Sequence, residues 1–393
     1  MDDTAATPER LFGGYPGRIL ALVTLGELII SFGGLVLPPL LPAIRASLSI
    51  SPAQAGAVMT VWWLFVALHN YPGGRLADQL THKTVLTAGL GLAAVGLLVL
   101  SAADTYLALL AGVAVLGLGR GLFQPAAITQ ISALFVAKRG QALGVRNAAF
   151  TLGGTAAGGA AVAVLAVADW RAAFPPIAGA LLVVAAVSHR WNRQSYELRR
   201  VSIGLRETGR RLAEMRDVRW LTLALSLYGF AWNGATSFLP TYLQVGKALD
   251  PATASLAFSG VFLVGGVAQP VAGLFGDRVG HLRAGAASAV LCSLGVGALV
   301  LGSGAVLVVG LVVFAVGLAS FWPVVTAHGM AMLPDESRGG DWGAVTTVYL
   351  VAESLGSTAV GLVAEYATYA DAYLLLLGCF LGTAGITTWL TRR

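Results

Sequence analysis

The sequence predicts an all-α polytopic membrane protein, and three observations support this fold class. Of the 393 residues, 56% are hydrophobic and only 11% are charged. The charged share is less than half that of an ordinary soluble domain, so most of the chain cannot face water. The mean hydropathy is +0.77, and the apolar residues form long runs. This composition excludes a disordered chain, a disulfide-stapled secreted module and an extended coiled coil.

Twelve apolar windows predict the membrane-spanning helices. A helix needs about 20 residues to cross about 30 Å of hydrocarbon. Turn residues rather than charges divide two closely spaced pairs, at Ala103-Asp104 and at Gly302-Ser303-Gly304. In chain order, the twelve windows are 18–40, 52–74, 84–103, 105–127, 141–167, 170–189, 218–240, 252–275, 283–302, 304–329, 341–364 and 371–390.

The placement of basic residues predicts that both termini lie inside, because Lys and Arg are retained on the cytoplasmic side. With this orientation the outer loops hold only three of the 25 basic residues, Arg45, Arg171 and Lys247. We expect a multi-pass protein of the cell membrane. Its predicted parts are a cytoplasmic tail (1–17), a six-helix bundle (18–189), a cytoplasmic linker (190–217) and a second six-helix bundle (218–393).

Nine of the 25 basic residues lie between Arg190 and Arg219, in the linker and at the start of the next span. Membrane topology explains this cluster, and the net charge of +6, better than binding to nucleic acid does. The mixture of Arg and Glu fits either an amphipathic helix on the anionic inner leaflet of the lipid bilayer or a solvated connection.

The two halves of the chain repeat each other at a nearly constant offset. Gly74-Arg75-Leu76-Ala77-Asp78 and Gly273-Leu274-Phe275-Gly276-Asp277 are both Gly-x-x-x-Asp, 199 positions apart, and Arg139-Gly140 and Arg338-Gly339 have the same offset. Gly117-Leu118 and Gly317-Leu318 match at an offset of 200. Such a repeat predicts two bundles derived from one unit, an arrangement in which transporters place their site between the halves.

These motifs resemble those of the major facilitator superfamily, over residues 15–393. The inter-helix signature is similar to GRLADQLTHK (74–83) and to GLFGDRVGHLR (273–283). Arg120-Gly121-x-x-Gln124-Pro125 and Asp169-Trp170-Arg171-Ala172-Ala173-Phe174 resemble two further family motifs. The first signature departs from the pattern at Gln79, where a base is usual, and at Thr81, where glycine is usual. The resemblance implies a secondary transporter with twelve helices.

Two acidic residues in the signatures are candidates for conformational gating. Asp78 and Asp277 sit where a carboxylate can accept bonds from a helix N-terminus or an arginine. Arg139 and Arg338 begin spans five and eleven on the same side of the membrane and are the predicted partners. The alternative is that both aspartates are ordinary helix caps.

Glu27, Arg120 and Glu353 are ionisable residues within predicted spans, where an unpaired charge is costly. Glu27 and Arg120 lie at similar depths, and the resemblance places their helices at a central cavity, so we expect an ion pair or a shared water-filled path. Glu27 and Glu353 are the candidates for binding protons. Arg146, beside Asn147, is expected at an interface or gate rather than at a ligand. The alternative for Glu27 and Arg120 is a purely structural pair.

Polar and aromatic residues in the lining spans predict the character of the cavity. Such mixtures suit a ligand with an apolar body and one charged or hydrogen-bonding end. The candidates are Gln124 in span four, Tyr228, Trp232 and Asn233 in span seven, and Trp322 in span ten.

The leading hypothesis is a monomeric, proton-coupled secondary transporter of a small molecule, and not an enzyme. The sequence has no motif for a catalytic nucleophile, a P-loop or a metal site, and we expect no cofactor. Arg120 favours an organic anion as substrate. Glu27 and Glu353, together with the aromatic residues, favour efflux of cationic, drug-like compounds as the alternative. A receptor or scaffold on the same fold is the alternative from another class.

Overall fold

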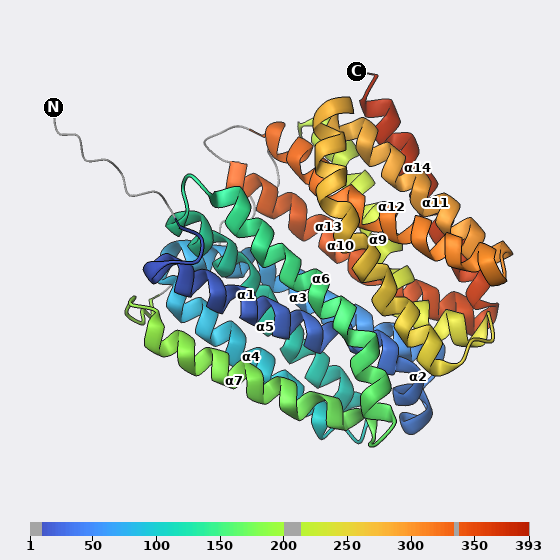
Figure 1. Ribbon diagram of the computed structural model, residues 1–393, viewed down its shortest axis with the longest axis horizontal. Helices are drawn as coiled ribbons and strands as arrows, with labels where there is room; N and C mark the ends of the chain where they lie inside the picture. Colours follow the sequence, from blue (N-terminus) through green and yellow to red (C-terminus); the bar gives the residue numbers. More distant parts are fainter. Residues whose placement is uncertain (1–9, 200–213, 334–337, 393) are drawn as a thin grey trace.

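The computed structural model describes residues 10–199, 214–333 and 338–392, and every regular element in these ranges is helical (Figure 1). The helices are α1 (Gly14–Leu35), α2 (Leu37–Leu48), α3 (Pro52–Gln79), α4 (His82–Ser101), α5 (Tyr106–Leu134), α6 (Arg139–Leu165), the short 3-10 helix η1 (Trp170–Ala173), α7 (Phe174–Trp191), α9 (Arg216–Val245), α10 (Pro251–Val279), α11 (His281–Leu301), α12 (Gly304–Ala331), α13 (Arg338–Tyr366) and α14 (Tyr369–Leu390).

The helices form two groups. Helices α1 to α7 pack mainly on one another and are called the first bundle, and helices α9 to α14 form the second bundle. Helix α1 begins and α14 ends at the same end of the molecule (Figure 1). We call this the terminal end and the opposite one the far end. Helix α3 runs from the far end to the terminal end, and α13 runs in the opposite direction. The two helices therefore meet between the bundles in an antiparallel arrangement.

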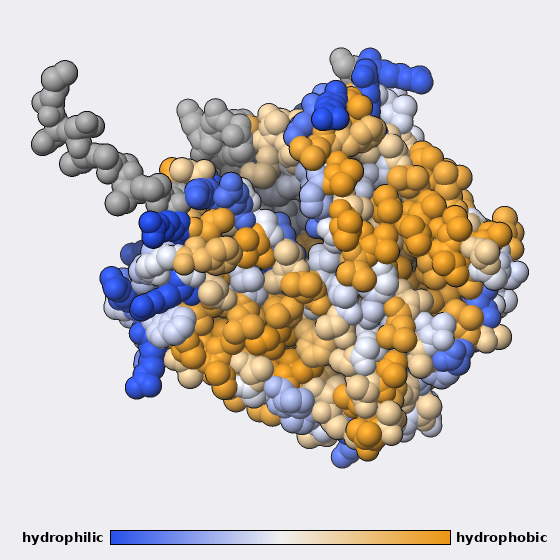
Figure 2. Space-filling view, viewed as in Figure 1, coloured by the Kyte–Doolittle hydropathy of each residue, from blue (hydrophilic) through white to orange (hydrophobic). Residues whose placement is uncertain are grey.

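Within the described residues, ten helical segments are long and apolar enough to cross a bilayer, against the twelve predicted. Helices α3 and α9 have the length, 28 and 30 residues, but are not among the ten. Their sequences explain this, since α9 opens with Arg216-Asp217 and buries several polar side chains, and α3 includes His69-Asn70. Apolar residues cover the flanks of both bundles, as a lipid-facing surface requires (Figure 2).

At the far end the two bundles are joined by hydrogen bonds between α3 and α13. The Thr60 hydroxyl donates to the Ser354 carbonyl oxygen over 2.7 Å. The Glu365 carboxylate accepts from the Ser51 hydroxyl at 2.7 Å and from the Ala53 backbone N–H at 3.0 Å. Because Ser51 caps α3, this carboxylate from the second bundle completes the N-terminus of a first-bundle helix.

Glycines bring the backbones of the bundles together at the same end. A Cβ atom added at Gly56 would lie 2.4 Å from the Ser357 carbonyl oxygen, and one at Gly361 would lie 2.4 Å from that of Pro52. Helices α6 and α10 meet in the same way, because a Cβ at Gly158 would lie 1.9 Å from the Ser255 carbonyl oxygen. Only glycine allows such approaches, as in other close helix crossings.

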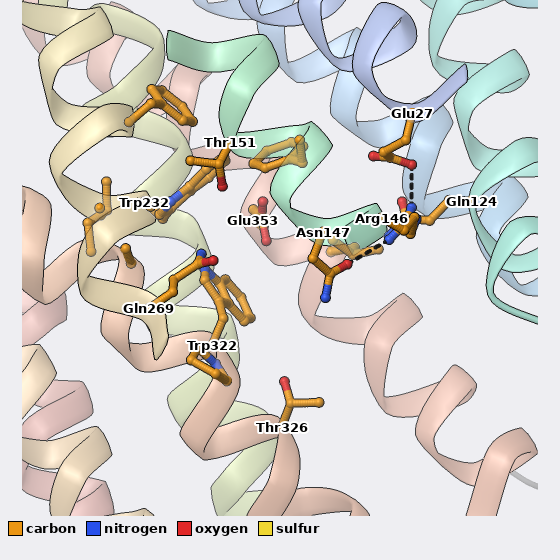
Figure 3. A pocket seen from close by; sticks show the side chains of 18 of the residues that line it. Glu27, Gln124, Arg146, Asn147, Thr151, Trp232, Gln269, Trp322, Thr326 and Glu353 are labelled. Carbon is orange, nitrogen blue, oxygen red and sulfur yellow. Dashed lines mark hydrogen bonds and ion pairs between the residues drawn. The ribbon is translucent and has the colours of Figure 1, made fainter. Parts of the chain in front are cut away.

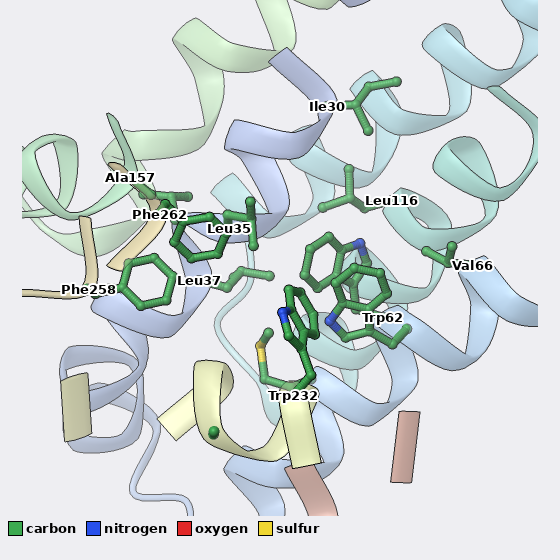
Figure 4. Close-up of a cluster of buried hydrophobic side chains, with 14 of the residues drawn as sticks. Ile30, Leu35, Leu37, Trp62, Val66, Leu116, Ala157, Trp232, Phe258 and Phe262 are labelled. Carbon is green, nitrogen blue, oxygen red and sulfur yellow. The ribbon is translucent and has the colours of Figure 1, made fainter. Parts of the chain in front are cut away.

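Between this contact and the centre of the molecule lies an apolar seal, a cluster of buried side chains from both bundles (Figure 4). Phe258 and Phe262 of α10 pack with centroids 5.0 Å apart. Trp63 of α3 meets Trp232 of α9 edge to face at 5.6 Å. Members of the seal include Leu35, Leu37, Trp62, Val66, Ala157, Trp232, Phe258 and Phe262. Large side chains from both bundles therefore pack closely on the far-end side of the centre.

Candidate functional site

A cavity of about 440 Å³ lies between the two bundles on the terminal side of the apolar seal. This volume lies in the range of small-molecule sites. The first bundle contributes residues of α1, α3, α5 and α6, and the second contributes residues of α9, α10, α12 and α13. Asn147 and Ile128, which line the terminal side, are exposed, whereas Glu27 and Glu353 deeper inside are buried. The cavity therefore opens towards the terminal end.

An ionic cluster forms the first-bundle wall of the cavity (Figure 3). Arg120 Nη2 donates to Glu27 Oε1 at 3.0 Å, and Arg146 Nη2 forms a short bond with Glu27 Oε2. The Ser31 hydroxyl donates to Glu27 Oε1 at 3.0 Å and accepts from Arg120 Nη1 at 2.9 Å. The carboxylate is thus held by groups on three helices, α1, α5 and α6.

This cluster carries more positive than negative charge. Two guanidinium groups share one carboxylate, and the three side chains are at most 6% exposed. The Nε atoms of Arg120 and Arg146 are buried without a hydrogen-bond partner. Arg120 also lies 5.3 Å from the ring centroid of Phe150, a cation–π distance. This wall of the cavity therefore has two buried donors without a partner and one positive charge in excess of its negative charge.

The second-bundle wall is acidic and aromatic. Glu353 of α13 is 3% exposed, and its Oε2 atom is buried without a hydrogen-bond partner. Trp322 and Tyr349 lie near it with ring centroids 5.3 Å apart, and Trp232 completes this wall. Gly229 of α9 leaves room for the carboxylate, because a Cβ there would lie 2.8 Å from Glu353 Oε2.

Most of the residues predicted to form the pathway do line the cavity: Glu27, Arg120, Gln124, Trp232, Trp322 and Glu353. The predicted Glu27–Arg120 contact is present. Arg146, which we expected at an interface or gate, instead belongs to the ionic cluster. Its Nη1 atom also donates to Asn147 Oδ1 at 3.1 Å.

Tyr228 and Asn233 do not line the cavity. The Tyr228 hydroxyl donates to the carbonyl oxygens of Gly317 and Leu318 on α12, at 3.1 and 3.0 Å. Asn233 Nδ2 donates to the backbone oxygen of Glu353 at 3.0 Å. Both side chains thus tie α9 to its neighbours, because polar groups inside an apolar bundle satisfy one another.

Sequence reasoning missed several lining residues. Phe150 and Thr151 lie one turn beyond Arg146 on α6, so the helical period could have found them. Gln269 precedes Pro270 in α10, and Thr326 lies one turn beyond Trp322 in α12. Their sequence signal is weak, since isolated Gln and Thr also occur at packed positions in helices. Within the described ranges no group of three or more His, Cys, Asp or Glu residues could hold a metal ion.

The sequence profile of the Major Facilitator Superfamily matches residues 23–250 and 246–393, which is nearly the whole chain. The chain belongs to this superfamily. The resemblance predicted from the motifs is confirmed, and the protein is a multi-pass membrane protein of this superfamily.

Curated relatives of this superfamily member are transporters. It is 26% identical over 270 residues to the probable sulfoacetate transporter SauU of Cupriavidus necator, covering 62% of this chain and 61% of that protein. It is also 26% identical over 251 residues to the probable L-galactonate transporter of Escherichia coli, covering 60% and 55%. In both cases the matched stretch spans less than two thirds of the relative's length.

Solved structures share the fold of this superfamily member. A bacterial homologue of the human lysosomal transporter Spinster, in an inward-facing and occupied conformation, has a TM-score of 0.80 at 16% identity, covering 97% of this chain and 98% of that one. The D-xylose-proton symporter has a TM-score of 0.77 at 15% identity, covering 95% and 97%. At such identities the likeness establishes the fold.

The predicted gating residues lie at the terminal end. Asp78 is exposed at the end of α3, and Asp277 is 3.4 Å from His281 one turn along its own chain. Arg139 donates to the Ser132 carbonyl oxygen at 3.3 Å, within its own bundle. Arg338 begins α13, but its side chain lies outside the described part. In the residues that the structure covers, neither aspartate pairs with an arginine.

The first superfamily signature departs from the pattern at two residues, and the start of the linker contacts both. The Thr81 hydroxyl donates to the Ser195 carbonyl oxygen at 2.7 Å, and Arg199 Nε donates to the Gln79 carbonyl oxygen at 2.7 Å. Thr81 has an ordinary φ of −78°, whereas Gly280, its counterpart in the second half, has a φ of +97°. Glycine is therefore needed in the second signature but not in the first.

Proposed function

We propose that this protein is a secondary active transporter that moves a small organic anion across the cytoplasmic membrane by alternating access, coupled to protons. The observation that carries the proposal is the excess positive charge on the first-bundle wall. Arg120 and Arg146 share Glu27, and both keep an unpartnered Nε donor. A carboxylate or sulfonate that reaches these arginines gains charge-assisted hydrogen bonds in a site shielded from water.

The same cluster offers a route to proton coupling. An anion that binds Arg120 and Arg146 competes with Glu27 for their donors. Glu27, once released from its arginines while still buried, is stabilised by taking up a proton. The anion and the proton would then cross together, and Glu27 would return to the arginines when both have left.

The proposal also includes the orientation, the number of spans, the gating residues and the oligomeric state. The positive-inside distribution supports cytoplasmic termini and twelve spans in two bundles, with α3 and α9 completing the count. With that orientation, the cavity opens to the cytoplasm, and the glycine contacts close the outer side. Asp78, Asp277, Arg139 and Arg338 remain candidates for contacts that form when the terminal end closes. Helices of one chain line the cavity on both sides, which supports a monomer.

The relatives support an anionic substrate, since two of them are named for sulfoacetate and L-galactonate transport. A second candidate function is efflux of cationic compounds. The acidic, aromatic second-bundle wall favours a cationic compound. Export as the direction of transport is favoured by a cephamycin export protein of Amycolatopsis lactamdurans, which is 30% identical over 137 residues, 34% of this chain.

Proteoliposomes with an imposed pH gradient test the proposal. We expect sulfoacetate or L-galactonate to accumulate with protons, and Arg120→Gln or Arg146→Gln to reduce the rate by about tenfold or more, because each removes a charge-assisted bond worth about 1.5–3 kcal/mol. Glu27→Gln should retain anion exchange but lose accumulation driven by the pH gradient.

Arg392→Gln is the matched control, because it removes the same charge from an exposed position near the end of α14. Unchanged anion uptake in both cavity arginine variants would contradict the proposal. Movement of a lipophilic cation against protons would favour the efflux alternative instead.

A further inference from the structure

The mechanism proposed above leaves Glu353 unused, although it is a buried carboxyl group at the cavity wall. We infer that Glu353 is the subsite for a positively charged group of the substrate, and that the transported solute is a zwitterion. Its anionic end would bind Arg120 and Arg146, and its ammonium end would bind Glu353. This inference rests on the proposed anion transport and names the substrate class more closely.

Glu353 is placed to receive a ligand. It lines the cavity, is 3% exposed and has one carboxyl oxygen, Oε2, without any partner. A carboxylate in a membrane interior needs a cation or a proton to offset the cost of burial. Glu27, the other buried acid of the cavity, already has two cations. Glu353 has none among the described residues, so a ligand can supply one.

Asn233 of α9 holds the backbone at Glu353 in place. The amide of Asn233 fixes the α13 backbone at Glu353 through its 3.0 Å bond to the carbonyl oxygen. The amide oxygen of Asn233 in turn accepts from Ser237 at 2.8 Å and from Ser357 at 2.7 Å. Gly229 leaves space beside the carboxyl oxygens. A site held by packed helices is suited to positioning a charge.

The surroundings of Glu353 favour an ammonium group over a second anion. Trp232, Trp322 and Tyr349 line the same wall, and the faces of aromatic rings attract cations. The basic residues of the lining, Arg120 and Arg146, both belong to the first bundle. In the view of Figure 3, Arg146 lies on one side of the cavity and Trp232 and Trp322 on the other, with Glu353 between them.

Charge is therefore segregated between the bundles. The titratable groups that share the cavity are Glu27, Arg120, Arg146, Tyr349 and Glu353. The first-bundle wall has one positive charge in excess, and the second-bundle wall has one carboxyl group without a counter-ion. A zwitterion that spans the cavity satisfies both walls at once, so it would favour the state in which the bundles close around it. A simple anion contacts the charged groups of one bundle only.

Isothermal titration calorimetry on the purified full-length protein tests this inference. The probes are ω-amino carboxylates of three to six carbons, each compared with the ω-hydroxy carboxylate of the same length. We expect at least one amino compound to bind about tenfold or more tightly than its hydroxy counterpart, a difference of about 1.4 kcal/mol.

Three variants localise the effect. Glu353→Gln should abolish the preference for the amino compound and keep the affinity for the hydroxy compound, which also shows that the variant is folded. Gly229→Ala retains the charge but displaces the carboxyl group, so it should reduce the preference partly. Glu214→Gln removes a carboxylate from an exposed position outside the cavity and should change neither affinity.

The outcomes separate this inference from the proposed function. Equal affinity for the two compounds in the unmodified protein, or a preference that persists in Glu353→Gln, would overturn the zwitterion subsite. Unchanged affinity for the hydroxy compound in Arg120→Gln would overturn anion binding at the arginines instead. Failure of all probes to bind would count against both.

Discussion

The two bundles each present one buried carboxyl group to the cavity, but the two groups have opposite surroundings. Glu27 in the first bundle is bound by Arg120, Arg146 and Ser31. Glu353 in the second bundle has a free carboxyl oxygen and aromatic neighbours. The two halves of the molecule thus present different chemistry to the same cavity. The first carboxyl group neutralises charges that the protein itself supplies, whereas the second is left for a charge that comes from outside.

The largest difference in stability is expected between the variants that neutralise Glu27 and Glu353. Glu27→Gln leaves two neighbouring guanidinium groups without their carboxylate, which should lower the free energy of unfolding by about 3–5 kcal/mol. Glu353→Gln should change it by less than about 1 kcal/mol, because no ion pair is broken. Thermal unfolding of the purified variants measures both. Equal losses would mean that the two acids have equivalent surroundings.

The next largest effect is expected at Ser31, which bonds both Glu27 and Arg120. Ser31→Ala should destabilise the protein by about 1.5–3 kcal/mol, since hydrogen bonds to charged groups are the stronger class. The control is Ser288→Ala, because the Ser288 hydroxyl is also buried but donates within its own helix, to the Ala284 carbonyl oxygen at 2.9 Å. If both variants lose the same stability, the ionic cluster does not depend on Ser31.

A smaller effect is expected at Phe150, whose ring lies against Arg120. Phe150→Leu should cost about 0.5–2 kcal/mol more than the loss of packing alone, because the cation–π contact disappears. Phe258→Leu in the apolar seal removes a ring that has no cation beside it in the described structure, and serves as the reference. The comparison uses the unfolding midpoint. A larger loss at Phe258 would argue that packing dominates both positions.

The smallest effect is expected for an exposed ion pair. Arg171 lies 3.4 Å from Asp104, whose side chain is 86% exposed. Asp104→Asn should change the free energy of unfolding by less than about 1 kcal/mol, because water screens the pair. Glu27→Gln, measured in the same experiment, provides the contrast with a buried pair. A loss at Asp104 as large as that at Glu27 would show that burial does not govern these interactions.

Much of the fold could be predicted from the sequence because bilayer crossing imposes a length and a composition on each helix. The family resemblance and the Glu27–Arg120 contact were also accessible, since both residues lie at similar distances from the ends of their helices. The count of twelve spans was less secure, because α3 and α9 bury polar groups against other helices rather than facing lipid.

Which other side chains face the cavity depends on the rotation of each helix about its own axis. Amino-acid composition does not indicate this rotation. Arg146 was expected at a gate, yet the rotation of α6 turns it towards Glu27. Tyr228 and Asn233 were expected in the cavity, but α9 turns them towards α12 and α13. The linker contacts at Gln79 and Thr81 join residues more than a hundred positions apart and have no local signal.

The glycine contacts at the far end limit which residues can stand at these positions without moving the bundles. Positions 56 and 361 touch backbone atoms of the opposite bundle, so there is no flexible side chain that can move aside. Any larger residue at either position would push the two bundles apart at the far end. A single bulky replacement at Gly56 or Gly361 is therefore expected to hold the far end open.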